Sequence, residues 1–158
     1  MVKKYPIISR LRTAVVRRFV LLLPWYYKKV WGAQIGKNVR ISFTTKIDKT
    51  NPRGVVIGDN TALAFGAAIL THDFVNSAHR ITKIGSCCFI GARSIIMPGV
   101  SIGDHCIIGS GAVVLKDVPS NSVVLGNPGR VMERGIKTGI WGMKLPDDAT
   151  DNSEKLID

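Results

Sequence analysis

The stretch IGARSIIMPGVSIGDHCIIGSGAVVLKD, residues 90–117, decides the fold because its apolar residues recur every six positions. Isoleucine or valine stands at positions 90, 96, 102, 108 and 114, and glycine follows three of them, at 91, 103 and 109. A helix repeats its apolar face every 3.6 residues and a strand every two. A period of six therefore predicts a different unit, made of one short strand and one turn.

The repeat continues on both sides of this stretch. Residues 84–119 divide without remainder into the hexads IGSCCF, IGARSI, IMPGVS, IGDHCI, IGSGAV and VLKDVP. Further hexads begin at Ile57, Leu63 and Ile69, and more degenerate ones at Ile35 and Ile41. The register slips around residues 51–54, and the insert VNSAHRITK (75–83) interrupts it again.

Three hexads close a triangular coil, and stacked coils pair their strands in parallel at a spacing of about 4.8 Å. The aliphatic residue at position one of each hexad then points inward, and the small or β-branched residue at position five fits a corner. The result is a β-solenoid whose coils contact only their neighbours. Ordinary alternating strands are the alternative, but they have no reason to keep this phase over six consecutive units.

Length and charge narrow the function classes. A chain of 158 residues with 46% apolar residues suits one domain. The formal net charge of +11 is uneven, since residues 1–47 contain Lys and Arg but no acid, whereas residues 146–158 carry five acids and a single Lys. A basic amino-terminal third predicts an anionic neighbour, such as a membrane surface, a polyphosphate or a nucleic acid. Because no nucleic-acid-binding module is recognisable, a nucleic-acid partner is not expected.

Residues 7–31 predict a basic amphipathic helix that ends near Pro24 and is followed by an aromatic, lysine-rich stretch. One interpretation is a membrane-surface anchor, and the other is a helix that covers the open end of the solenoid. The apolar run 19–23 is too short to span a bilayer, which takes roughly 20 residues. No signal-peptide cleavage site follows it, so we expect a cytoplasmic protein, with the inner face of the membrane as a possible location.

Residues 30–134 resemble the hexapeptide-repeat acyltransferases, and the segment IGSGAVVLKDVPSNSVVLGNPGRVM (108–132) is similar to the carboxy-terminal signature of the sugar O-acetyltransferases of galactoside, maltose and exopolysaccharide type. The resemblance implies an all-β fold, a left-handed parallel β-helix, and a homotrimer with each active site between two subunits. It also implies acetyl-CoA as the acyl donor. We expect a helical segment at 1–31, the β-helix at 32–134 and a carboxy-terminal extension at 135–158.

Acetyl transfer to a hydroxyl needs a base for the hydroxyl proton and a donor for the tetrahedral oxyanion. The resemblance places the catalytic histidine at His72, in ILTHDF, where the repeat breaks off. Asp73 falls nominally at an inward position, so either the coil has opened there or Asp73 orients His72. His79, inside the insert, is the alternative base, and His105 is expected to be an exposed turn residue.

The cofactor contacts are carried over from the resemblance. It implies that the backbone amide of Ala92 meets the thioester and that Ser110 contacts the pantetheine arm. Leu115 and Lys116 match a Thr-Lys pair, of which Lys116 keeps the charge for a phosphate. Arg130 matches an arginine near the adenosine phosphate. A second family arginine falls on Glu133, with Arg134 adjacent, which leaves that contact open.

A metal site is not expected. Related β-helix carbonic anhydrases bind zinc through three histidines, and this chain also has three. Their spacing here does not match that family. Cys88 and Cys106 occupy the same position of hexads that are one full coil apart, so one should stack on the other as small core residues, while Cys87 should point outward.

The sequence therefore predicts an O-acetyltransferase that moves an acetyl group to a sugar hydroxyl, on a surface polysaccharide or its lipid-linked precursor. Two alternatives stay open: an amino acceptor on an amino sugar or antibiotic, and a non-catalytic β-helix scaffold.

Overall fold

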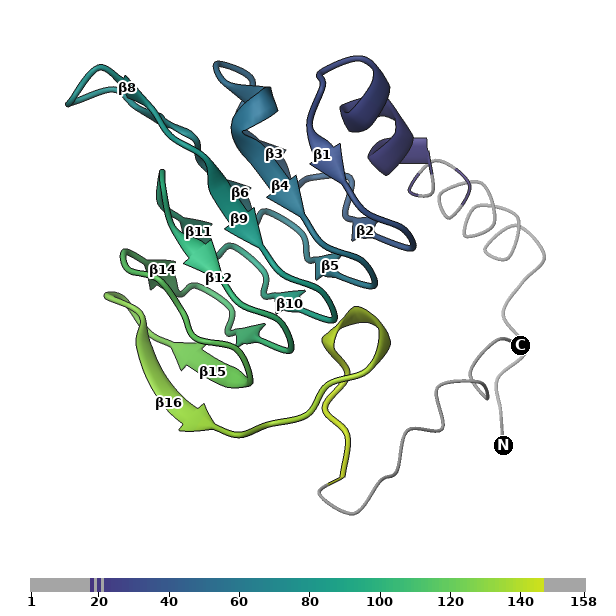
Figure 1. Cartoon of the computed structure of the whole chain (residues 1–158), viewed down its shortest axis with the longest axis vertical. Coiled ribbons are helices and arrows are strands. Elements are labelled where there is room, and N and C mark those ends of the chain that lie inside the picture. The colour runs from purple at the N-terminus through teal and green to yellow at the C-terminus, as the bar shows by residue number, and fades with distance from the viewer. Residues whose placement is uncertain (1–17, 19, 21, 147–158) are drawn as a thin grey trace, which may run out of the picture.

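The computed structural model describes residues 18, 20 and 22–146, which form a three-faced stack of short strands (Figure 1). The first face has the order β1 (Gln34–Ile35), β4 (Val55–Ile57), β9 (Thr82–Ile84), β12 (Ser101–Ile102). The second has β16 (Arg130–Arg134), β15 (Ser122–Leu125), β13 (Ile107–Ile108), β10 (Phe89–Ile90), β5 (Ala62–Leu63), β2 (Arg40–Ile41). The third has β14 (Val113–Val114), β11 (Ile95–Ile96), β6 (Ala68–Ile69), β3 (Lys46–Ile47). Neighbouring strands on these faces are parallel, except that β15 and β16 are antiparallel.

The predicted coil of three hexads is confirmed for the central coil, whereas the last coil is shorter, since Ile107 pairs with Val123. Phe89 pairs with Ile107, its equivalent three hexads further along, so this coil is regular. Arg40 pairs with Ala62, and Ala62 pairs with Phe89, so the two earlier coils are longer than three hexads. These longer coils contain the two register slips, a 3-10 turn η1 (Pro52–Gly54) and a projecting hairpin of β7 (His72–Asp73) and β8 (Ala78–His79).

The three faces form a triangular prism. Its three edges differ, and we name them by their turns in the central coil. Edge A joins the first and second faces at residues 85–88, edge B joins the second and third at 91–94, and edge C joins the third and first at 97–100. Both longer segments, 48–54 and 70–81, connect a strand of the third face to one of the first, so both leave the prism at edge C.

The core follows the predicted pattern of positions one and five. Ile84, Ile90, Ile96, Ile102 and Ile108 at position one are buried. Cys88 and Cys106 stack as predicted, with the Cys106 amide 3.4 Å from the Cys88 sulfur, and both are fully buried. Hydrogen bonding to Cys106, together with burial, raises the pKa of the Cys88 thiol, which therefore stays protonated.

Glycine at position two reflects the close approach of successive coils. A Cβ added at Gly91 would lie 2.6 Å from the backbone carbon of Gly109 in the next coil. Real Cβ atoms do not approach backbone so closely, so a side chain here would force the coils apart. The Ile-Gly pairs of the sequence therefore mark where one turn sits directly on the next.

The amino-terminal helix covers the end of the stack next to β1 (Figure 1). The sequence predicted that this helix ends near Pro24, but the helix runs to Lys29. Leu23, Tyr27 and Trp31, spaced four residues apart, pack against the first coil, and this packing offsets the hydrogen bond that Pro24 cannot donate. The capping interpretation is thus correct for residues 22–31. Residues 7–17 of the predicted helix lie outside the described residues.

Residues 135–146 form a strap that runs back along edge A from the last coil toward the first. The Trp141 indole nitrogen donates to the Asn38 carbonyl (2.9 Å) and its amide donates to the Asn60 carbonyl (2.7 Å). Nearer the last coil, the Thr138 hydroxyl donates to the Cys87 carbonyl (2.6 Å). The strap therefore contacts the turns of successive coils. The acidic tail, residues 147–158, lies outside the described residues.

Candidate active site

The projecting hairpin places two imidazoles side by side. His72 on β7 lies opposite His79 on β8, and their ring centroids are 5.2 Å apart with the rings nearly perpendicular. His72 is half-buried and His79 is exposed. No described residue forms a hydrogen bond with the His72 ring, so its nitrogens are free to meet a substrate.

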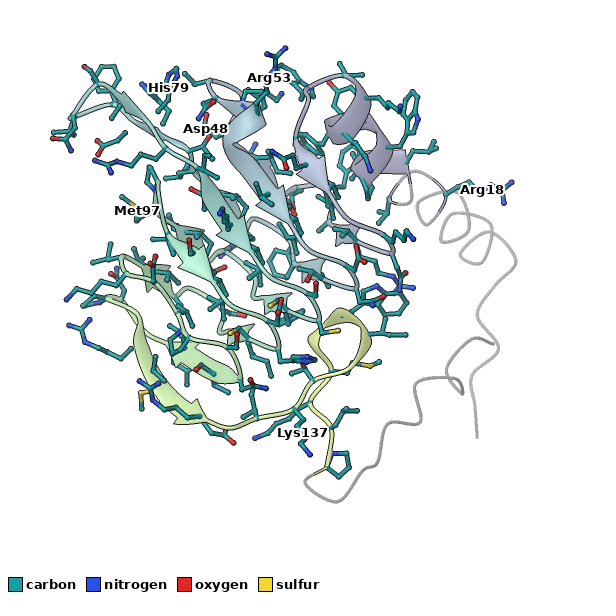
Figure 2. All side chains as sticks on the ribbon, viewed as in Figure 1. Arg18, Asp48, Arg53, His79, Met97 and Lys137 are labelled. Atoms are coloured by element: carbon teal, nitrogen blue, oxygen red, sulfur yellow. The ribbon has the colours of Figure 1, made fainter. Side chains whose placement is uncertain are left out.

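We call the two longer segments that leave the prism at edge C, 48–54 and 70–81, excursions. Asp48 lies on the first of them and fixes the backbone of His72. Its Oδ2 accepts hydrogen bonds from the amides of Thr71 (2.9 Å) and His72 (2.8 Å), and its Oδ1 accepts one from the Thr50 amide (2.8 Å). Figure 2 shows Asp48 and His79 near one another at the base of the hairpin. Burial raises the pKa of Asp48, but these hydrogen bonds outweigh burial and lower it overall. Sequence reasoning missed this residue, although it is the first acid in the chain and directly follows the hexad residue Ile47.

Asn51 closes the hairpin at its base. Its side-chain amide donates to the carbonyls of Thr71 and Arg80, both at 3.3 Å, and its own carbonyl accepts the Thr71 hydroxyl at 2.7 Å. The two excursions of edge C therefore hold each other in place, and His72 sits where they meet.

Asp73 faces the hairpin turn. Its carboxylate accepts the side-chain amide (2.7 Å) and the backbone amide (3.1 Å) of Asn76. These two bonds to Asn76, with Arg80 nearby, lower the pKa of Asp73. Of the two interpretations of Asp73, the structure agrees with the opened coil, and no hydrogen bond joins its carboxylate to the His72 ring.

Edge B presents two backbone amides that lack a partner among the described residues. The N–H groups of Ala92 and Ser110 donate to no described residue, while the Ala92 carbonyl accepts from Gly111 (2.8 Å). On edge A, the amide at the same position, the third of the hexad, donates to a side-chain oxygen of the next coil. The pairs, amide first, are Lys37 and Asp59, Asp59 and Ser86, Ser86 and Asp104, and Asp104 and Ser120. Edge B carries Phe43, Phe65 and Ala92 at this position, which have no side-chain acceptor, and Ser110, whose hydroxyl forms no hydrogen bond with the Ala92 amide. Among the described residues, the amides of Ala92 and Ser110 therefore stay open to a ligand.

Comparison with known proteins identifies the family. Residues 81–116 match the family described as "Bacterial transferase hexapeptide (six repeats)". Over 116 residues the chain is 34% identical to the protein named "Putative acetyltransferase YvoF" of Bacillus subtilis (strain 168), covering 72% of this chain and 67% of that protein. The chain belongs to the hexapeptide-repeat transferases.

Two further relatives carry more specific names. The galactoside O-acetyltransferase of Escherichia coli (strain K12) is 32% identical over 118 residues, which cover 69% of this chain and 57% of that protein. The solved serine acetyltransferase of Neisseria gonorrhoeae is 29% identical with a TM-score of 0.58, covering 67% of this chain and 40% of that chain. The chain thus spans about two thirds or less of these relatives. Its prism is the left-handed parallel β-helix of the hexapeptide-repeat acyltransferases.

The other residues predicted to bind the cofactor by resemblance to the hexapeptide-repeat acyltransferases are exposed at the surface. Leu115 and Lys116 stand on edge C, two coils from His72, and both are exposed. Arg130 begins β16, and among the described residues its guanidinium donates to the neighbouring Gly129 carbonyl (3.3 Å). Glu133, at the position of a family arginine, forms an ion pair with Lys144 (2.6 Å).

The structure separates the predicted site residues within one chain. His72, Leu115 and Lys116 share edge C, whereas Ala92 and Ser110 share edge B, and the third face lies between them. A single prism therefore does not bring the candidate base to the candidate oxyanion donor.

His105 differs from its predicted exposed position. Its Nδ1 lies 2.9 Å from the Thr138 carbonyl, so the ring is half-buried under the strap. Among residues 18, 20 and 22–146, no group of three His, Cys, Asp or Glu side chains is arranged to hold a metal ion.

Proposed function

We propose that the chain is an acetyl-CoA-dependent O-acetyltransferase that acts on a sugar hydroxyl. The observation that carries this proposal is the His72 ring, unbonded to any described residue and fixed through its backbone by Asp48 at the base of the projecting hairpin. Membership of the hexapeptide-repeat transferases, with relatives named acetyltransferases, supports the same chemistry.

The reaction we propose is a direct transfer. The His72 imidazole takes the proton of the acceptor hydroxyl, and the oxygen attacks the carbonyl carbon of the thioester. The tetrahedral oxyanion accepts a hydrogen bond from the Ala92 amide. The carbon–sulfur bond then breaks, and the thiolate of coenzyme A takes the proton from the His72 imidazolium. Donor acetyl and acceptor proton are exchanged without an acyl-enzyme.

Coenzyme A is long and anionic, and the described residues offer matching groups. The open amides of Ala92 and Ser110 suit the polar amide groups of the pantetheine arm, because backbone donors without partners bind such acceptors. Lys116 and Arg130 are exposed cations near the later coils, and they suit the phosphates. Leu115, 52% exposed, offers a backbone and an apolar contact beside Lys116.

We propose that the complete site forms between chains of a homotrimer. In this arrangement edge C of one subunit meets edge B of the next, so that His72 approaches the partner's open amides. Exposed apolar residues support it on both edges: Phe74 (84%) and Val75 (90%) at the hairpin tip of edge C, and Phe43 (73%) and Phe65 (55%) on edge B. Such patches on a monomer mark association sites.

The acceptor we favour is a sugar, because the similarity to the galactoside O-acetyltransferase covers 69% of this chain. We propose that this sugar belongs to a surface polysaccharide or its lipid-linked precursor. The likeness to a serine acetyltransferase favours a second candidate, the hydroxyl of a small amino acid. An amino acceptor on an amino sugar or antibiotic uses the same base and donor.

The test is release of free thiol from acetyl-CoA in the presence of a panel of sugars, amino sugars and serine. The variant His72→Asn should lower kcat by about a hundredfold or more, since it removes the general base. The matched control His105→Asn changes an imidazole under the strap and should keep turnover. Equal activity of His72→Asn and the control would reject the assignment, and absence of coenzyme A binding by calorimetry would favour the scaffold alternative.

A further inference from the structure

The amino-terminal helix has a second apolar face that the prism does not cover. Its inner side, with Leu23 and Tyr27, packs on the first coil. On the opposite side Leu22, Trp25 and Tyr26 are spaced by three and four residues and are 55%, 59% and 38% exposed. Val30, just after the helix, is 60% exposed. A helix whose only role is to cap the prism would present polar residues on this side.

Basic residues flank this outer face. Arg18 and Lys29 fall on the same side of the helix as Leu22 by their spacing of four and seven residues, and both are exposed. Figure 2 shows Arg18 pointing away from the prism. Residues 1–47 contain eleven Lys and Arg residues and no Asp or Glu, so no acidic side chain from this part of the chain neutralises the patch.

We propose that this outer face, formed by Arg18, Leu22, Trp25, Tyr26, Lys29 and Val30, docks the protein on an anionic lipid bilayer. The apolar and aromatic side chains enter the headgroup–acyl boundary, and the cations meet acidic headgroups, so the helix lies in the plane of the surface. Within the described part of the chain, no helix has the length and apolarity that crossing a bilayer requires.

The composition of the face favours lipid over a second copy of the chain. Trp and Tyr are the residues that settle at headgroup depth, where one side of the ring is apolar and the other is wet. Two copies meeting through this face would bring like charges together, which costs binding free energy unless acids intervene. The inference does not depend on the proposed acetyl transfer, because none of these residues belongs to the candidate site.

The experiment is co-sedimentation of the full chain with vesicles. Wild type should pellet with equimolar phosphatidylglycerol and phosphatidylcholine, should stay in the supernatant with phosphatidylcholine alone, and should be released by added salt. The double variant Trp25→Ser, Val30→Ser should bind the acidic vesicles at least about tenfold more weakly, because two exposed apolar side chains are lost. Arg18→Gln with Lys29→Gln should weaken binding about fivefold per charge.

The matched control is Met132→Ser, which removes an equally exposed apolar side chain (66%) from β16 at the other end of the prism. It should bind acidic vesicles as wild type does. Thermal unfolding by circular dichroism checks that every variant is folded. The proposal is overturned if wild type pellets equally with both vesicle types, or if the folded double variant pellets like the control. A change of molar mass in the double variant without vesicle binding by wild type would assign the face to self-association instead.

Discussion

The carboxylate of Asp48 accepts a hydrogen bond of 2.8 Å from the backbone amide of His72. The same oxygen accepts a hydrogen bond from the amide of Thr71, so one charged group orders two consecutive residues where the chain enters the hairpin. A carboxylate bound by several amides is a strong local anchor because each bond is charge-assisted. Asp48 therefore acts on His72 through the backbone and leaves the imidazole free.

The first prediction concerns Asp48→Asn. We expect the free energy of unfolding to fall by about 1–2 kcal/mol, since charged acceptors are replaced by a neutral one. Turnover should fall with it, because His72 loses its fixed position, while the affinity for coenzyme A should stay unchanged. Urea unfolding and steady-state kinetics measure the two effects. An unchanged kcat in the variant would show that the hairpin is held by other contacts.

The same residue predicts a pH dependence of stability. The pKa of Asp48 in the folded protein lies below its ordinary value of 3.8. Its contribution is therefore complete above that value and is lost as the pH falls through the lower, folded value. Wild type should lose more stability below about pH 4 than Asp48→Asn does. Parallel curves for the two proteins in urea titrations at several pH values would contradict this assignment.

The open amides of edge B can be closed by design. On edge A, the carboxylate of Asp104 binds the amide of Ser86 in the preceding coil at 2.6 Å. Ser110→Asp places the same group below Ala92, and we expect coenzyme A affinity to fall at least about tenfold, since a donor is blocked and an anion is added. The melting temperature should not fall. Ser110→Ala, which leaves the Ala92 amide open, should bind nearly as wild type in calorimetry.

A site shared between chains predicts complementation. His72→Asn and Ser110→Asp are each expected to turn over poorly alone when acetyl-CoA is kept below saturation. Mixed and reassembled, they should recover a fraction of wild-type turnover, because some interfaces pair an intact edge C with an intact edge B. A mixture that stays as inactive as its components would place both residues in a site within one chain.

The hairpin tip tests the interface directly. Phe74→Ser with Val75→Ser removes two nearly fully exposed apolar side chains. We expect a shift from trimer toward monomer in sedimentation velocity, together with loss of turnover. Met143→Ser, which changes an exposed residue of the strap, is the control and should leave the molar mass unchanged. A variant that remains trimeric would show that other surfaces make the contact.

The strap predicts a stability effect away from the site. Trp141 donates from both its indole and its amide, and the Arg40 guanidinium lies 3.2 Å from its ring centroid. Trp141→Ala should lower the free energy of unfolding by about 2–3 kcal/mol, through lost packing, cation–π contact and hydrogen bonds. Gly142→Ala should also destabilise, because its Cβ would collide with the Phe89 backbone. Urea unfolding measures both, and wild-type stability in either variant would contradict the tight fit of the strap.

The prism itself could be predicted from the sequence because its cause is periodic. Ile90 points inward for the same reason as Ile84 and Ile96, because each is the first residue of a hexad. The pattern can therefore be recognised from its repetition over many units. The contacts that hold His72 are different, because those of Asp48 and Asn51 are not repeated in other coils. Their hydrogen bonds join residues that are 20 or more positions apart in the sequence. No local pattern records such a pairing.

The difference between edges A and B was also present in the sequence, but it could not be assigned. It depends on whether position three carries an acceptor, as in Asp59 and Asp104, or none, as in Phe65 and Ala92. Assigning a hexad to an edge requires the lengths of the two longer coils, which only the strand pairing provides. Trp141 likewise contacts Asn38 across 103 residues, beyond the reach of a short-range pattern.

The confinement of both irregular segments to edge C has an evolutionary consequence. Insertions there lengthen a turn without changing the stacking of the aliphatic residues, so they cost the scaffold little. Chains built on one scaffold can differ in these loops, and with them in their choice of acceptor, while the open amides of edge B stay the same. New specificities in such a lineage should therefore arise by loop replacement at a single seam.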